Sequence, residues 1–359
     1  MSIGLPKIEI VFKQLAVSAV QRSERGIVAL IVKDDTDDSF NVVEYKSVTE
    51  IETEKFTSAN AAYIADVLEG GASKVIVARI AAADGTLAQA IAAIGSKKYN
   101  WIGYAEGLTA DQTALVTYAK EQEAANKKHF KAMVFNATAP DTMTVVNFGN
   151  AKVTKADGTE VTGEKYIARL MGTFAGLPLT QSGTYKIMSD LKYVEEPADV
   201  EEAINAGKLV LFNDEETVRI ARAVNSLTTL GTDKTEDMQK IIIVETMQLI
   251  QEDILKTFKD DYLGKYKNKY DNQVLFITAV NAYFEALEDE DVLDPEFDNV
   301  AFVDVEAQRA AWLAVGKTEA AEWDDAKVRI NTFRSNVYLS GSIKILDAIE
   351  DFKFNITMQ

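Results

Sequence analysis

Continuous apolar runs that alternate with helical segments constrain the fold of this chain more than any other feature. Four such runs occur, at residues 26–33 (GIVALIVK), 74–80 (KVIVARI), 99–104 and 131–136. Segments with helical periodicity separate them, at residues 57–70, 87–94 and 109–126. Strands and helices in this order favour a largely parallel sheet with right-handed crossovers and helices on its faces.

Local signals refine this expectation. A more exposed strand is predicted at residues 40–48, and Thr109 and Gln112 are spaced as a capping box. Asp157 and Gly158 lie between two short alternating segments, which predicts a β-hairpin insertion at about residues 145–162. Later elements are predicted as a helix at residues 163–175, strands at 209–213 and 218–224, and helices at 235–258, 271–287 and 305–315. The last thirty residues return to strand patterns.

The predicted fold class is therefore α/β, with a central mostly parallel sheet and flanking helices, followed by an α+β C-terminal domain. We expect an N-terminal arm strand at residues 1–25 and an α/β domain at 26–230. The C-terminal domain is expected at 231–340, and a C-terminal arm strand at 341–359.

Both ends of the chain carry strand patterns with one apolar face. The residues on these faces are Ile8, Ile10 and Phe12 at one end, and Phe352, Phe354, Ile356 and Met358 at the other. Termini are usually polar and frayed, so these faces need a cover. The two ends could pair with each other at the edge of their own sheet. Alternatively, they could add strands to other copies of the chain.

Composition narrows the function. The chain has 38 basic and 56 acidic side chains and a net charge of −18, which disfavours binding to nucleic acid or to anionic membranes. No stretch reaches the roughly 18 apolar residues of a membrane span, and the first residues lack the apolar core of a signal peptide. Without cysteine, disulfides and thiolate metal sites are excluded.

The sequence contains no recognisable catalytic, cofactor-binding or metal-binding motif, so we predict no residues with these functions. His129 is the only histidine and lies in a lysine-rich helix end, where a solvated role is expected. Residues 316–318 (GKT) resemble the end of a phosphate-binding loop. However, that loop requires a glycine at position 311, where this chain has Ala311. Residues 34–38 (DDTDD) lack the glycine and the distal glutamate of a calcium loop, so we expect a solvated turn.

Two charge clusters remain. Lys265, Lys267 and Lys269 alternate with tyrosines, and residues 285–298 form an acidic run. Both are expected to be solvated surface segments. Because copies of so acidic a chain repel one another, a lysine cluster that meets an acidic run on another copy would favour assembly.

Several segments resemble a known family. Residues 60–80, residues 167–180 (IARLMGTFAGLPLT), residues 264–283 and residues 339–351 are similar to segments of contractile phage tail sheath proteins. The resemblance extends over nearly the whole chain. It is strongest to the sheaths of R-type bacteriocins and of defective prophages of Gram-positive bacteria. The part of the sheath often called subtilisin-like has that fold only, and this chain lacks a credible Ser/His/Asp set, so a protease function is not expected.

The resemblance implies a structural function without cofactors. Sheath subunits form stacked six-fold rings around an inner tube, and their terminal arms add strands to the sheets of neighbouring subunits. The assembled sheath contracts without a nucleotide. The implied partners are other copies, the inner tube protein, and baseplate and tail terminator or collar proteins. Assembly would occur in the bacterial host cytoplasm, before release as part of the particle. The segment 304–325 is the candidate for contact with the tube, through Arg309, Trp312, Lys317 and Trp323, with both tryptophans expected to be exposed.

Two other classes of function remain open from the residues alone. An α/β enzyme such as a hydrolase would need polar groups that converge at the carboxyl ends of the strands. A monomeric adaptor would show no tendency to form rings or tubes.

Overall fold

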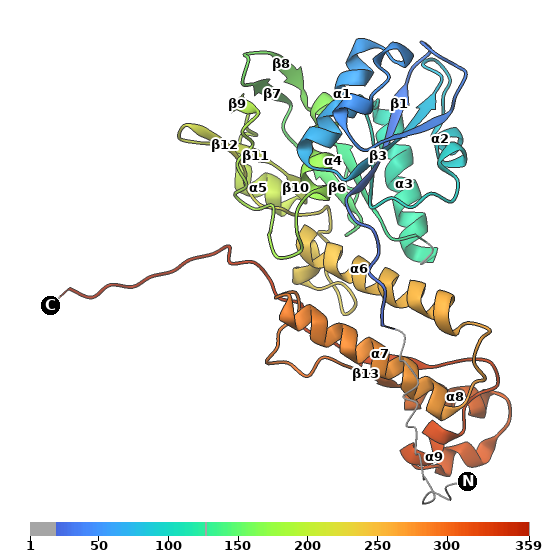
Figure 1. The fold of residues 1–359 in the computed structure, drawn as a ribbon. Coiled ribbons are helices and arrows are strands. Elements are labelled where there is room, and N and C mark those ends of the chain that lie inside the picture. Colours follow the sequence, from blue (N-terminus) through green and yellow to red (C-terminus); the bar gives the residue numbers. More distant parts are fainter. Residues whose placement is uncertain (1–18, 126–127, 359) are drawn as a thin grey trace, which may run out of the picture. The chain divides into compact units, whose positions relative to one another are not determined.

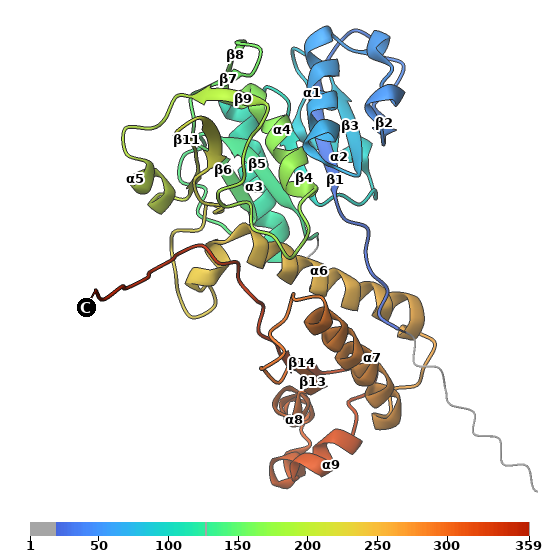
Figure 2. The same cartoon turned by 60° about the vertical axis from the view of Figure 1, so that its left-hand side comes forward.

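The computed structural model describes residues 19–125 and 128–358, and the chain divides into two compact units (Figures 1 and 2). The sheet unit comprises residues 23–252 and 345–358, and the helical unit comprises residues 19–22 and 253–344. The division after residue 252 falls inside the long helix α6 (Ile241–Thr257). The domain boundary predicted near residue 230 precedes it.

A seven-stranded sheet forms the centre of the sheet unit. Its strands follow the order β10-β6-β5-β4-β1-β3-β2, and all neighbours are parallel except β2 and β3. The bounds are β1 Ile27–Lys33, β2 Val42–Tyr45, β3 Lys74–Ile80, β4 Trp101–Tyr104, β5 Lys131–Phe135, β6 Val145–Phe148 and β10 Lys208–Leu209. The mixed α/β class with a mostly parallel sheet is confirmed.

Helices cover both faces of this sheet, which explains the unbroken apolar runs. Helices α1 (Ser58–Gly70) and α4 (Gly163–Ala175) pack on one face, and α2 (Leu87–Ile94) and α3 (Thr109–Ala125) on the other (Figure 2). Successive side chains of β1 alternate between the two cores. Leu30 belongs to the first core and Ile31 to the second.

Glycines bring α1 and α4 unusually close. A Cβ atom on Gly172 would lie 2.1 Å from the carbonyl oxygen of Val67, and one on Gly70 would lie 2.7 Å from the backbone of Gly172. Neither position has room for a side chain. Two of the segments that resemble sheath proteins, residues 60–80 and 167–180, therefore contact each other at this helix crossing.

The helix caps agree only in part with the sequence signals. Thr57 caps α1, and Gly71 ends it close to the predicted bounds of residues 57–70. The capping box predicted at Thr109 is wrong, because the backbone N–H of Gln112 donates to the carbonyl of Leu108 instead. A capping box does form at Thr86 and Gln89, ahead of α2.

Smaller sheets complete the sheet unit. The predicted hairpin is confirmed as β7 (Lys152–Lys155) and β8 (Glu160–Thr162), with Gly158 at a φ of 89°. It begins later than expected, because β6 belongs to the central sheet. The remaining elements are β9 (Leu191–Val194), α5 (Val200–Asn205), β11 (Leu211–Asp214) and β12 (Thr217–Ile220), with short 3-10 turns at Val48–Glu50, Thr53–Lys55 and Glu236–Gln239.

The helical unit is built on α7 (Tyr270–Asp289), which follows a short π-helical turn at Phe258–Tyr262. Strand β13 (Val300–Val303) pairs antiparallel with β14 (Leu339–Ser342), and between them lie α8 (Val305–Ala314), a 3-10 turn (Thr318–Glu322) and α9 (Asp325–Ile330). Of the strands expected in the last thirty residues, only β14 forms within the described chain. No helix in the described ranges is long and apolar enough to cross a membrane.

Candidate assembly interface

The C-terminal residues expose an apolar row that no other part of the described chain covers. Phe352 is 85 % exposed, Phe354 68 %, Ile356 74 % and Met358 91 %. Residues 351–358 form no strand and lie outside every sheet (Figure 2). The pairing of the two chain ends is not observed within the described residues. The N-terminal counterparts, Ile8, Ile10 and Phe12, lie outside those residues.

Directly before this row, a cluster of acidic side chains ties the chain to the sheet unit. The side chain of Glu350 is almost fully buried, and its Oε1 accepts hydrogen bonds from Ser182 Oγ at 2.9 Å and Thr184 Oγ1 at 2.7 Å. Its Oε2 lies 3.5 Å from Lys240 Nζ and 3.9 Å from Arg222 Nε. We call residues 347–351 the anchor and residues 352–358 the arm.

The flanking carboxylates complete the anchor. Asp351 accepts from Arg222 Nη2 at 2.7 Å, and Asp347 pairs with Lys240. Burial lowers the pKa of Lys240, but the hydrogen bond to Asp347 and the charge of Glu350 outweigh it, so the pKa is raised. Two cations therefore hold three carboxylates, and the arm leaves from a fixed point.

Backbone pairing brings the two cations together. Val224 and Lys240 form an antiparallel bridge, the N–H of Asn225 donates to the carbonyl of Gln239, and the N–H of Ile241 donates to the carbonyl of Ala223. The intervening residues 226–238 form a long excursion, most of it exposed. The spacing of Arg222 and Lys240 in the sequence indicates nothing about this contact.

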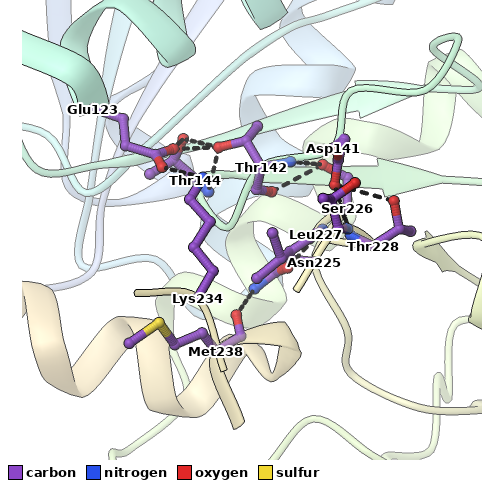
Figure 3. Close-up of polar contacts among 11 residues, drawn as sticks. Glu123, Asp141, Thr142, Thr144, Asn225, Ser226, Leu227, Thr228, Lys234 and Met238 are labelled. Atoms are coloured by element: carbon purple, nitrogen blue, oxygen red, sulfur yellow. Dashed lines mark hydrogen bonds and ion pairs between the residues drawn. The ribbon is translucent and has the colours of Figure 1, made fainter. Parts of the chain in front are cut away.

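A polar network fixes the start of this excursion against the edge of the sheet (Figure 3). The carboxylate of Asp141 accepts from the N–H groups of Thr228 and Thr229, both at 2.8 Å. Hydrogen bonds from Thr229 and Thr228 hold the pKa of Asp141 well below its usual range. Ser226 Oγ donates to the carbonyl of Thr142 at 2.9 Å.

Two further contacts hold the return of the excursion. Glu123, on α3, accepts from Lys234 Nζ at 3.0 Å and from Thr144 Oγ1 at 2.9 Å (Figure 3). Asn225 Nδ2 donates to the carbonyl of Met238 at 2.7 Å. The network therefore sets the register in which Arg222 and Lys240 meet.

In the helical unit, the two-stranded sheet of β13 and β14 presents an unpaired edge. Within the described residues β14 pairs with β13 alone, whereas the far side of β13 is partly occupied, because Ala301 N–H donates to Asn281 Oδ1 at 2.7 Å. Phe302 is 45 % exposed on this sheet. Two-stranded sheets are marginally stable in water, so an added strand would stabilise this one.

The expectation that both tryptophans of the segment 304–325 are exposed is wrong. Trp323 is buried, and Trp312 is half-buried between the rings of Trp323 and Phe333 at centroid distances of 6.1 and 5.0 Å. Arg309 donates to the backbone carbonyls of Ala320 and Trp323, and Lys317 pairs with Glu319 at 2.6 Å. The exposed apolar side chains of this segment include Leu313 and Val315.

The expectation of a solvated turn at residues 34–38 is wrong for Asp34, which is buried. Its carboxylate accepts from Thr36 N–H at 2.9 Å, Thr57 N–H at 2.8 Å and Asn60 Nδ2 at 2.7 Å. Burial alone would raise its pKa, but these hydrogen bonds lower the pKa to about 2. The side chain thus connects the end of β1 to the start of α1.

A buried lysine that the sequence did not single out lies at the start of β5. Lys131 Nζ contacts Glu245 Oε1 at 3.0 Å and Gln248 Oε1 at 2.6 Å, and lies over the Trp101 ring. Burial lowers the pKa of Lys131. His129 lies half-buried beside this pair, at the amino end of the strand. The contacts of Lys131 attach α6 to the sheet and explain its burial.

Comparisons with known proteins agree with this architecture. Residues 233–359 match the family described as the phage tail sheath C-terminal domain. The sheath tail protein of Desulfitobacterium hafniense has a similar structure, with a TM-score of 0.71 at 16% identity over 83% of this chain and 94% of its own. A chain of the anti-feeding prophage baseplate matches with a TM-score of 0.65 at 11% identity over 100% of both chains. The fold is therefore that of contractile tail sheaths.

Sequence similarity makes the assignment specific. The chain is 32% identical to the tail sheath protein of Clostridium phage phiCD119, over 99% of each protein. It belongs to the phage tail sheath protein family, whose members are structural components of contractile injection systems and not enzymes. The hydrolase alternative is thereby excluded.

Proposed function

We propose that this sheath subunit polymerises as a helical stack of six-membered rings around an inner tube. The N-terminal and C-terminal arms add strands to neighbouring subunits. Contraction of the stack then drives the tube through the envelope of a target cell, without a nucleotide.

The exposed arm is the observation that carries this proposal. Burying one large apolar side chain stabilises a contact by about 1.5–3 kcal/mol, so four in a row would supply several kcal/mol for each neighbour. An isolated subunit does not gain this stabilisation, because its apolar arm residues 352–358 face solvent while the anchor holds residues 347–351. The arrangement favours donation to another copy over a monomeric adaptor.

The free edge of β14 is the proposed acceptor for an arm strand. An arm of alternating apolar and polar side chains has the pattern of a strand that is half buried in a sheet. Adding it to β14 would satisfy exposed backbone groups and cover the exposed ring of Phe302. In this proposal, the arm of one copy pairs with β14 of another copy.

Contraction is proposed as a change between two packings of the same subunits. Arms that remain paired would keep the subunits connected, while the surfaces of the bodies slide. A difference of a few kcal/mol per subunit, summed over many copies, is enough to perform work. Contacts that do not close into a ring produce the helical stack.

Further partners are proposed on the basis of the family. The inner tube protein would contact the segment 304–325, and baseplate and terminator or collar proteins would bind the ends of the stack. Assembly would take place in the bacterial host cytoplasm, followed by release with the particle.

Truncation tests the proposal. We expect deletion of residues 1–17 or of residues 351–359 to leave a folded monomer that does not assemble. Negative-stain electron microscopy and sedimentation velocity would compare each truncation with the full chain, and circular dichroism would verify the fold. Helical tubes of normal length from both truncated chains would contradict the function proposed for the arms.

A further inference from the structure

The helical unit contains an open aromatic pocket that neither the family assignment nor the arm contacts explain. It has a volume of about 100 Å³. Its lining includes Phe258, Tyr262, Tyr266, Gln273, Phe276 and Val337. The rings of Tyr262 and Phe276 pack edge to face at 4.8 Å, and those of Phe258 and Phe276 at 5.3 Å. Leu263, on the rim, is 60 % exposed.

A buried polar atom in this lining lacks a partner. Gln273 is only 3 % exposed, and its Nε2 donates to Asn268 Oδ1 at 2.8 Å. Its Oε1 is buried and accepts no hydrogen bond within the described residues. A buried acceptor left unpaired is destabilising, so a bound group with an N–H would stabilise the site.

Backbone contacts place the pocket at one end of β14. Ser335 and Val337 line it and lie a few residues before that strand. Asn268 Nδ2 donates to the carbonyl of Asn336 at 2.9 Å, which attaches this stretch to the pocket wall. A strand that pairs with β14 and continues beyond its first residue would therefore reach the pocket.

The lengths of donor and acceptor require such an overhang. Strand β14 has 4 residues and spans about 13 Å, whereas the seven arm residues 352–358 would span about 23 Å when extended. About three arm residues must pass the ends of β14. Because alternate arm residues are large and apolar, an overhanging end brings an apolar side chain and backbone N–H groups with it.

We propose that the aromatic pocket is a socket for the C-terminal arm of a second copy of this chain. One terminal apolar side chain of the arm enters the pocket, and an arm backbone N–H donates to Gln273 Oε1. The socket then fixes the register of the added strand, which four backbone pairs alone specify poorly. This inference rests on the proposed function of the arm, but it makes separate predictions.

Cysteine cross-linking tests the contact directly, because the chain has no cysteine of its own. Two differently tagged variants would be co-assembled and oxidised, one carrying Ser335→Cys and the other Phe352→Cys or Met358→Cys. We expect a disulfide between copies from position 335 to one end of the arm, identified by mass spectrometry. The arm end that reacts reports the direction of the strand. Ala326→Cys, on the exposed part of α9, is the control and should not react.

Filling the pocket provides the second test. Ser335 is exposed at the rim, so Ser335→Phe should occupy the pocket without disturbing the core, whereas Ala326→Phe adds the same ring elsewhere. We expect the critical concentration for assembly to rise at least tenfold for Ser335→Phe and to change less than twofold for Ala326→Phe. Circular dichroism verifies that both variants fold.

Two results would overturn the inference. One is the absence of any disulfide from position 335 in assembled tubes, and the other is normal assembly of Ser335→Phe. Either result, together with loss of assembly on arm deletion, would reject the socket and leave the proposed function of the arm intact. Normal assembly without the arm would reject the proposed function itself.

Discussion

At the scale of single residues, Glu350 marks the point where the chain stops contacting its own sheet unit. Its carboxylate contacts two hydroxyls and two cations, and two residues later the apolar side chains face solvent. The buried Glu350 and the exposed Asp351 bind the same arginine but differ in burial. Buried charge-assisted contacts contribute more than exposed ion pairs, so Glu350 is the stronger attachment.

We therefore expect Glu350→Ala to release the anchor while the sheet unit stays folded. The free energy that holds the anchor on the sheet unit should fall by about 1.5–3 kcal/mol, because hydrogen bonds to a charged group are removed. A spin label on Ile349→Cys, in a chain without other cysteines, would show a sharper electron paramagnetic resonance spectrum. Asp351→Ala is the matched control and should leave the spectrum nearly unchanged. Equal spectra for both variants would show that Glu350 is not the main attachment.

Asp34 allows a prediction on pH dependence. Asp34→Ala should lower the free energy of unfolding by about 2–4 kcal/mol, because Thr36, Thr57 and Asn60 lose their acceptor. The folded-state pKa of about 2 lies below the unfolded value of about 3.9, so the contribution is complete above about pH 4. It is lost as the pH falls from 4 towards 2.

Urea unfolding followed by circular dichroism at several pH values would measure this effect. The difference between the native chain and Asp34→Ala should shrink as the pH approaches 2. Asp38→Ala, in the same loop but exposed, is the control and should change the free energy of unfolding by less than about 0.5 kcal/mol. A difference that stays constant between pH 4 and 2 would contradict the role assigned to the carboxylate.

At the scale of elements, periodicity predicted most strands and helices of the sheet unit. The runs at residues 26–33 and 74–80 form β1 and β3. Helices cover both faces of these strands, so successive residues are buried and a continuous apolar sequence is favoured. The long helix expected from residue 235 begins at Ile241, after a 3-10 turn. Its start depends on the bridge between Val224 and Lys240, a tertiary contact that no local pattern reveals.

The arm is an element whose structure depends on a second copy. We expect Phe354→Asp to leave the monomer folded and to reduce assembly more than a hundredfold, because burying an unpaired charge costs several kcal/mol. Asn355→Asp adds the same charge to the opposite face of the strand and should have a much smaller effect. Sedimentation velocity would compare the two variants. Equal losses would show that total charge, and not the apolar face, controls assembly.

At the scale of the whole molecule, net charge opposes assembly. Each copy carries a charge of −18, so long-range repulsion must be overcome before the arms can engage. The screening length falls from about 30 Å at 0.01 M salt to about 8 Å at 0.15 M. We expect light scattering to show faster assembly of the purified chain at the higher salt concentration. Slower assembly at 0.15 M would indicate that complementary surface charges dominate the encounter.

The sequence by itself determined the α/β class, the mostly parallel sheet, the β7–β8 hairpin and the apolar row of the arm. These features follow from local periodicity and turn chemistry, which act over a few residues.

Only the tertiary structure decided where that row is attached and what surrounds it. Arg222, Lys240, Ser182 and Glu350 meet through backbone pairings between distant segments, and the two tryptophans expected at the surface pack in a small core. Composition indicates that such side chains need partners. Which partners they find depends on how elements far apart in the sequence pack together.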